Sequence, residues 1–448
     1  QGLDQYHTGM YWYTPKDTVD HYFKKAKAAI TQDMDALAFH KIIAPLVALS
    51  REDHTNIFLP ESLQDSIRKQ ARYFPMTVVF LGEQLYCVEN ASGENIDIEG
   101  REIQSINGKT PQQIVDNIGN LFASDGYITE VKKSDLEGFA FARYFYYFYG
   151  IIPAFNIEFK GLDSAVNLKA QSRSAIVNHL REGRKGKEKK PAKESLEFKL
   201  LNDSIAYLGI HTFSNDDYKE NHTHQKLKPF LAESFKKLKE KKIKTLIIDV
   251  SENTGGNEGN ENLLYSYIGG NYQKYKKVSA KAQKVILDNG VDQPIKLKTF
   301  GFFERVFANK KMPDGSYERK KKIGFGLMAY KKKPKNTFKG ELFVIISPVT
   351  YSGGSEFSNM VRTNHLATFV GQETGGGYQG NTSGYSARLT LPHSQIMIKI
   401  PSLKFEMNVT PAEIYGRGVL PDYEVIPSFE EYVKGEQSAL NFILNLKK

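Results

Sequence analysis

Residues 345–357 read IISPVTYSGGSEF. An apolar run typical of a buried strand ends in a polar turn with two glycines, and the residues from Phe357 to Arg362 have the pattern of a helix start. A serine at such a corner leaves regular structure, so the Ser352 hydroxyl can face a cleft beside the amide of Gly353. Nucleophilic serine chemistry needs such a hydroxyl with a donor for the developing oxyanion. The alternative is an ordinary turn whose serine caps the helix.

A second segment repeats this design. Residues 245–257 read TLIIDVSENTGGN, again a buried-type strand that runs into a polar turn and a glycine pair. Glycines at such a turn let the backbone approach a ligand and expose its amides. We therefore expect Gly255 or Gly256 to lie across a cleft from Ser352 and to donate to the same oxyanion.

Four segments in order resemble the motifs of the S41 family of serine peptidases, which includes C-terminal processing peptidases and tricorn-like members. DVSENTGG at 249–256 is similar to the family's DLRNNxGG, and TYSGGS at 350–355 to its TxSAxE. GQETGG at 371–376 and GVLPD at 418–422 are similar to GExTxG and GVxPD. The resemblance implies an α/β catalytic domain of crotonase-like or ClpP-like fold, with Ser352 as nucleophile and no cofactor.

The general base is the open question. Many S41 members use a lysine just after GExTxG, but Gly377 occupies that place here, and no motif positions Lys399 or Lys404. The tricorn-like branch uses a histidine, and Asp53-His54-Thr55 resembles its DxHT element. The resemblance therefore implies His54 as base, and an ordinary imidazole pKa near 6.5 suits that role. The alternative is a surface or capping histidine. His211 and His365 are weaker candidates.

The third member of the relay is also read from the resemblance. The family's glutamate precedes GVxPD at a position that is Tyr415 here, so Glu413, two residues earlier, is the nearest carboxylate. We predict Glu413 as the group that orients the imidazole. Asp53 is a weaker candidate, because neighbouring side chains rarely meet productively. Two further carboxylates near the motifs, Glu356 and Glu373, are interpreted as structural.

The chain divides into three predicted parts. Residues 1–70 have helical periodicity, residues 71–125 have strand-like texture, and residues 126–448 carry the motifs on alternating strands and helices. The sequence Ile103-Gln104-Ser105-Ile106-Asn107-Gly108-Lys109 before a helix resembles the PDZ-like domain of these peptidases, although a hairpin turn is the simpler alternative. Basic insertions near 181–194 and 310–336 interrupt the catalytic part.

Composition narrows the function classes. The 448 residues carry a net charge of +10, which comes from lysine-rich and arginine-rich loops without a nucleic-acid-binding motif. We therefore expect no nucleic-acid partner; the family resemblance implies a polypeptide substrate, and oligomerisation is left open. No apolar run is long enough to span a membrane. The chain starts at Gln1 without a methionine, and we expect an exported protein, whether periplasmic, envelope-associated or secreted. The single cysteine, Cys87, is interpreted as a core residue.

Two functions from different classes remain. The first is a serine endopeptidase that forms an acyl-enzyme at Ser352 and acts on C-terminal or unfolded segments. The second is a catalytically inactive relative that binds a peptide or hydrophobic ligand, since the lysine is missing and the glutamate is displaced. An α/β-hydrolase is disfavoured because Ser352 lacks a GxSxG elbow. No metal site is expected, because the chain has no HExxH motif and only one cysteine.

Overall fold

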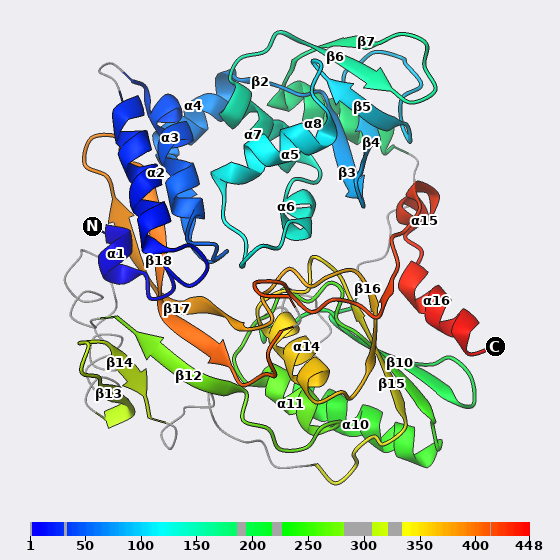
Figure 1. Cartoon of the computed structure of the whole chain (residues 1–448). Helices are drawn as coiled ribbons and strands as arrows, with labels where there is room; N and C mark the ends of the chain where they lie inside the picture. Colours follow the sequence, from blue (N-terminus) through cyan, green and yellow to red (C-terminus); the bar gives the residue numbers. More distant parts are fainter. Residues whose placement is uncertain are drawn as a thin grey trace.

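The computed structural model describes residues 2–30, 34–185, 194–216, 226–281, 307–320, 334–412 and 414–448. The described chain forms a predominantly parallel sheet with helices, a long curved second sheet, a group of N-terminal helices and a separate antiparallel sheet (Figure 1). The predicted basic insertions lie partly outside the described residues, and Glu413 lies outside them entirely.

The two principal motifs lie on a six-stranded sheet with parallel pairing at all but one edge. Its spatial order is β19 (Tyr423–Glu424), β16 (Thr368–Gly371), β15 (Glu341–Ile346), β11 (Thr245–Asp249), β10 (Ile205–Ile210) and β9 (Leu196–Leu200). The central strands are almost wholly apolar because helices cover both faces. β11 and β15 are neighbours in register, with Asp249 opposite Ile345, so their motif-bearing turns leave the sheet at the same edge.

Helices complete the α/β domain that the sequence predicts. α10 (Leu227–Glu240), α11 (Asn260–Ser266) and α14 (Gly353–Thr363) share one hydrophobic core with one face of the sheet. α16 (Ser438–Leu446) covers the opposite face, where Leu440 and Ile443 pack on Ile247 and Ile345. α15 (Phe429–Lys434) precedes it.

A second sheet joins the N-terminal segment to the catalytic part. Its order is β1 (Asn56–Phe58), β18 (Met397–Met407), β12 (Tyr275–Ala280), β14 (Tyr317–Arg319) and β13 (Asn309–Lys311), and β17 (Gly380–Thr390) also pairs with β18. β1 is antiparallel to β18, with Asn56 opposite Lys399. This pairing fixes the segment around His54 against residues that lie more than three hundred positions later in the sequence.

The N-terminal part is helical, as its periodicity predicts. α1 (Gly2–Tyr6), α2 (Lys16–Ala29), α3 (Ala36–Ala48) and α4 (Glu61–Gln70) precede the first strands of the next part. Asp35 caps α3 by accepting a hydrogen bond from the Ala38 amide. Among the described residues, no helix is both long and apolar enough to cross a membrane.

A five-stranded antiparallel sheet follows, in the order β3 (Met76–Leu81), β4 (Gln84–Asn90), β5 (Glu102–Ile106), β6 (Ala154–Phe159) and β7 (Val166–Lys169). β6 and β7 belong to this sheet, so it continues past residue 125, where the sequence places a domain boundary. The associated helices are α5 (Pro111–Ile118), α6 (Glu130–Asp135), α7 (Phe139–Tyr149) and α8 (Arg173–Gly183). The short strands β2 (Arg72–Tyr73) and β8 (Gln171–Ser172) pair beside them.

Candidate active site

Ser352 has a strained backbone at the start of a helix. It stands at the N-cap of α14 with φ 48° and ψ −119°, a conformation that residues other than glycine rarely adopt. Its side chain makes no capping hydrogen bond to the helix, so the alternative of a simple capping serine is not what the structure contains. Backbone strain of this kind persists only where the surrounding structure holds the residue in place, and it is common at active sites.

The glycine turn lies directly against Ser352. A Cβ atom added at Gly255 would stand 2.6 Å from Ser352 Cβ and 2.9 Å from the Gly353 nitrogen, closer than any side chain tolerates. Gly255 also has a φ of +101°, which favours glycine on its own account. The Tyr351 amide donates to the Asn253 carbonyl at 2.9 Å and holds the two turns together.

Two backbone amides, one in each turn, retain an unused hydrogen-bond donor within the described part of the chain. The Gly255 amide already donates to Asn253 Oδ1 at 2.9 Å. In contrast, the amides of Gly353 and Gly256 have no hydrogen-bond partner in the part of the chain that the structure describes. Of the predicted donors, Gly353 and Gly256 therefore keep the capacity to stabilise a developing negative charge, and Gly255 provides the close approach.

His54 lies next to the residue that precedes the serine. Its ring packs on the Tyr351 ring with centroids 5.5 Å apart and planes inclined at 33°. The Nδ1 atom of His54 is buried without a hydrogen-bond partner among the described residues. Burial, with a smaller contribution from the Lys399 ammonium, lowers the pKa of His54 to about 4. The imidazole is therefore neutral near pH 7, which is the form that can accept a proton.

A carboxyl group that the sequence interpretation missed connects these elements. Asp125 Oδ1 accepts hydrogen bonds from the Asp53 amide at 3.0 Å and from the Tyr351 hydroxyl at 3.2 Å. Its Oδ2 accepts from the Gly377 amide at 3.1 Å. Gly377, the place of the family's lysine, thus lies against Asp125. The Asp125-Gly126 dipeptide reads only as a turn signal, so no motif could have identified it.

Buried carboxyl groups are crowded around this network. Burial, then repulsion from Asp53, raises the pKa of Asp125 to about 7. Burial and the nearby Asp125 raise the pKa of Glu52 well above its usual range, although Glu52 Oε2 accepts a hydrogen bond from the Thr382 amide at 2.7 Å. Both effects favour the neutral carboxyl form of Glu52. A neutral form lowers the electrostatic cost of grouping several carboxyl groups in this network.

Glu373 and Glu413 are the other two carboxylates close to the motifs. Glu373 pairs with Arg417 and accepts a hydrogen bond from the Gly418 amide at 2.8 Å. Tyr415, at the family's glutamate position, donates its hydroxyl to the Trp12 carbonyl at 2.7 Å. Glu413 lies outside the described residues, so its role stays a prediction.

Three carboxylates next to the first turn of α14 converge as metal ligands would. Glu258, Glu261 and Glu356 lie together, but the buried Lys274 ammonium stands between them. Lys274 Nζ is 2.6 Å from Glu261 Oε1 and 2.7 Å from Glu356 Oε2, and it also contacts Glu258. The lysine already supplies the positive charge of this cluster. It ties the glycine turn and α11 to the first turn of α14.

The remaining residues considered near the motifs are two histidines, a lysine and a second serine. His211 is buried, with Nδ1 3.9 Å from Glu252 Oε2, and His365 sits in the turn after α14 with a φ of 50°. Lys404 lies 3.6 Å from Glu406. Ser355, one helical turn after Ser352, donates its hydroxyl to the Ser352 carbonyl at 2.8 Å and is therefore occupied.

Comparisons with known proteins identify a family model and solved structures that this chain resembles. The model of peptidase family S41 matches residues 204–425. The structure of mature CPAF complexed with lactacystin resembles this chain with a TM-score of 0.63 and 14% identity, over 100% of this chain and 95% of that chain. Another structure of mature CPAF gives a TM-score of 0.58 and 14% identity, over 96% and 92%. The photosystem II D1 C-terminal processing protease gives 0.42 and 12%, over 98% and 96%. No curated protein matches the chain.

Proposed function

Because the chain belongs to peptidase family S41, we propose that this peptidase is a serine endopeptidase that cleaves polypeptides through an acyl-enzyme on Ser352. The observation that carries the proposal is the Ser352 turn. Its strained backbone leaves the hydroxyl without a capping bond, and the partner-free Gly353 amide lies beside it. Structural serines at helix starts normally make the capping bond that is missing here.

In the proposed reaction, Ser352 Oγ attacks the scissile carbonyl carbon while His54 takes the hydroxyl proton. The carbonyl oxygen becomes an oxyanion that accepts hydrogen bonds from the Gly353 and Gly256 amides. Collapse of the intermediate breaks the C–N bond, and the imidazolium gives its proton to the leaving amine. Water then attacks the ester by the same route and restores the serine.

His54 is proposed as the base on its position and its protonation state. The β1–β18 pairing and the contact with Tyr351 place the ring beside the serine turn. Burial keeps the imidazole neutral. Glu413 is retained as the proposed third member, because Nδ1 of His54 has no partner in the described part of the chain. A carboxylate at that atom would stabilise the imidazolium.

Hydrolysis of an unfolded protein such as casein, followed by mass spectrometry, tests the proposal. Wild-type protein is expected to produce new peptide termini, and Ser352→Ala is expected to produce none while keeping its circular dichroism spectrum. Ser355→Ala is the matched control, because it removes a hydroxyl one turn away that already has a partner. Turnover by Ser352→Ala equal to wild type would exclude Ser352 as nucleophile.

A separate cavity favours the second candidate function, which is binding of a hydrophobic ligand. The N-terminal helices and strands β17 and β18 line an apolar space of about 510 Å³, with Met10, Val19 and Ile398 in its wall. Displacement of a fluorescent fatty acid would test this function independently of Ser352.

Export from the cytoplasm also stays a prediction, and fractionation of expressing cells would test it.

A further inference from the structure

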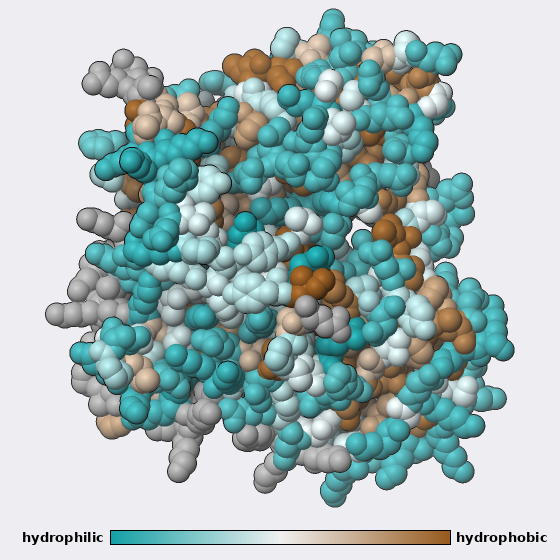
Figure 2. All heavy atoms as spheres, in the orientation of Figure 1, coloured by the Kyte–Doolittle hydropathy of each residue, from teal (hydrophilic) through white to brown (hydrophobic). Residues whose placement is uncertain are grey.

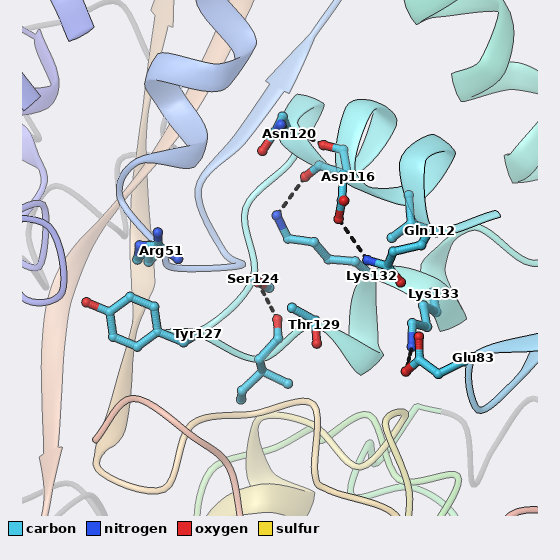
Figure 3. A pocket seen from close by; sticks show the side chains of 13 residues that line it. Arg51, Glu83, Gln112, Asp116, Asn120, Ser124, Tyr127, Thr129, Lys132 and Lys133 are labelled. Carbon is cyan, nitrogen blue, oxygen red and sulfur yellow. Dashed lines mark hydrogen bonds and ion pairs between the residues drawn. The ribbon is translucent and has the colours of Figure 1, made fainter. Parts of the chain in front are cut away.

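A polar cavity borders the segment that carries His54. It has a volume of about 650 Å³ and is lined from three sides by Arg51, by α5 and the turn after it, and by Lys132 and Lys133 of α6 (Figure 3). On the face seen in Figure 2, hydrophilic side chains predominate and hydrophobic ones form small separate groups. Most residues that line the cavity are charged or polar, so charge and hydrogen bonds can contribute to recognition there.

Two cations in the wall have no carboxylate partner among the described residues. Arg51 donates from one guanidinium nitrogen to the Gly126 carbonyl at 3.2 Å and stacks on the Tyr127 ring, 4.4 Å from its centroid. Lys132 Nζ donates to the Gly119 carbonyl at 2.6 Å. Lys133, in contrast, pairs with Glu83 at 2.6 Å and Glu130 at 3.0 Å. The first two cations retain unused donors.

The charge balance of the wall favours binding of an anion. Burial, then repulsion from Arg51, lowers the pKa of Lys132 to about 8, and the carboxyl groups of Asp135 and Asp53 only partly offset this. Asp116, the remaining acid in the wall, accepts a hydrogen bond from Gln112 at 2.8 Å. Figure 3 shows the Lys132 side chain extending from α6 toward the side of the pocket where Arg51 lies. A carboxylate between them would satisfy both donors.

The cavity is connected to the candidate active site through the backbone. The Gly126 amide donates to the Arg51 carbonyl at 2.9 Å, and Asp125 accepts from both the Asp53 amide and the Tyr351 hydroxyl. Two residues lie between Arg51 and His54, so their Cα atoms are at most about 11 Å apart. An extended peptide advances about 3.3 Å per residue. A group bound beside Arg51 would therefore lie a few residues of extended peptide from the cleaved bond.

We propose that the cavity between Arg51 and Lys132 binds a carboxylate of the polypeptide substrate and so gives this peptidase a preference for acidic substrates near the cleavage site. This inference rests on the proposed endopeptidase function. The carboxylate can belong to an aspartate or glutamate side chain or to the substrate's C-terminus. The planar fork of Arg51 suits bidentate contact, and Lys132 adds a second charge.

Paired peptides separate these sources. One series of internally quenched peptide amides carries a single Glu at each position in turn, with Gln in the matched partners, and a second series compares free acids with amides. Wild-type protein is expected to show a kcat/KM roughly tenfold to a hundredfold higher for the carboxylate-bearing member at one position. A preference within the first series identifies a side chain, and a preference for the free acid identifies the C-terminus.

Variants assign the preference to the cavity. Lys132→Met is expected to bring the carboxylate-to-neutral ratio close to one, and Lys132→Arg to retain most of it. Lys109→Met is the matched control, because Lys109 is exposed in the turn between β5 and α5 and does not line the cavity. Equal kcat/KM for every pair in wild-type protein, or an unchanged ratio in Lys132→Met, would overturn the proposal.

A binding measurement keeps this test separate from catalysis. Fluorescence anisotropy with Ser352→Ala protein and labelled members of the same pairs is expected to show tighter binding of the carboxylate peptide. If wild-type protein hydrolyses no peptide but this difference appears, the endopeptidase function fails and the carboxylate site stands. If peptides are hydrolysed without preference and bind equally, the carboxylate site fails and the endopeptidase function stands.

Discussion

The ring of His54 lies 5.5 Å from the ring of Tyr351, centroid to centroid, although about 300 residues separate them in the sequence. Tyr351 immediately precedes Ser352, and its hydroxyl donates to Asp125. The N-terminal segment and the α/β domain therefore meet at the residue that precedes the proposed nucleophile. Removal of residues 1–70 would take away His54 and strand β1 together.

Two variants of Tyr351 distinguish the contribution of its ring to activity from the contribution of its hydroxyl. Tyr351→Phe removes the hydrogen bond to Asp125 and leaves the surface that supports His54, so kcat/KM is expected to fall by no more than about tenfold. Tyr351→Ala removes that surface, and misplacement of the base is expected to cost roughly a hundredfold. Steady-state peptide hydrolysis checks both variants. Equal losses in the two would mean that the ring contact does not position His54.

Gly255 is expected to be intolerant of a side chain for steric reasons. Gly255→Ala would push a methyl group into Ser352 and the Gly353 amide, so activity should fall by roughly a hundredfold or more. Gly108→Ala is the matched control, because Gly108 also has a positive φ of 71° but has no atom within 4 Å of its added Cβ. That control should lose some stability and keep its activity. Comparable inactivation of both variants would contradict the role of the turn.

The low pKa of His54 is expected to shift the acidic limb of the pH–rate profile to lower pH. Protonated imidazole cannot accept the serine proton, so kcat/KM should fall as the pH drops through about 4 and should remain high at pH 5.5. An unperturbed histidine would give a limb near 6.5. A limb near 6.5 in protein shown to be folded would contradict a buried neutral His54.

Folding must be followed in the same buffers, because other histidines also titrate on unfolding. The folded chain lowers the pKa of His7 to about 3 and of His40 to about 4, in both cases chiefly through burial. The unfolded chain binds protons at these groups below about 6.5. Their contribution to the free energy of unfolding is therefore constant above that pH and decreases as the pH falls from about 6.5 to about 4 for His40 and to about 3 for His7.

Lys274 is expected to be essential for stability. Lys274→Met would leave the buried Glu261 and Glu356, and the more exposed Glu258 beside them, without their cation, at a cost of roughly 3–5 kcal/mol. Urea unfolding followed by circular dichroism checks this loss. Lys16→Met is the control, since Lys16 pairs with Asp20 on an exposed face and should hardly affect the midpoint. A urea-unfolding midpoint of Lys274→Met equal to that of wild type would contradict the role of Lys274 in joining α11 to α14.

The sequence predicted the elements with local signals and missed those defined only by long-range contacts. The family and the α/β fold were predicted correctly because each motif combines a buried strand with a glycine turn. Asp125 was missed because its importance comes from contacts with Tyr351 and Gly377, more than two hundred residues away. The five-stranded sheet passes residue 125 because β6 pairs with β5 across three intervening helices and a 3-10 turn, which composition does not reveal. The engagement of the Gly255 amide by Asn253 is likewise visible only in the folded turn.

The most direct test of catalysis by Ser352 and His54 is covalent labelling with a fluorophosphonate, followed by mass spectrometry of the digested protein. The reagent phosphonylates a serine only when a base and an oxyanion site activate it. We expect a single adduct on Ser352 in wild-type protein. Folded His54→Ala protein should be labelled at least about a hundredfold more slowly. His393→Ala, which changes a histidine outside the site, should be labelled at the wild-type rate. An absence of labelling in wild-type protein, an adduct on another serine, or full-rate labelling of Ser352 without His54 would contradict the proposed mechanism.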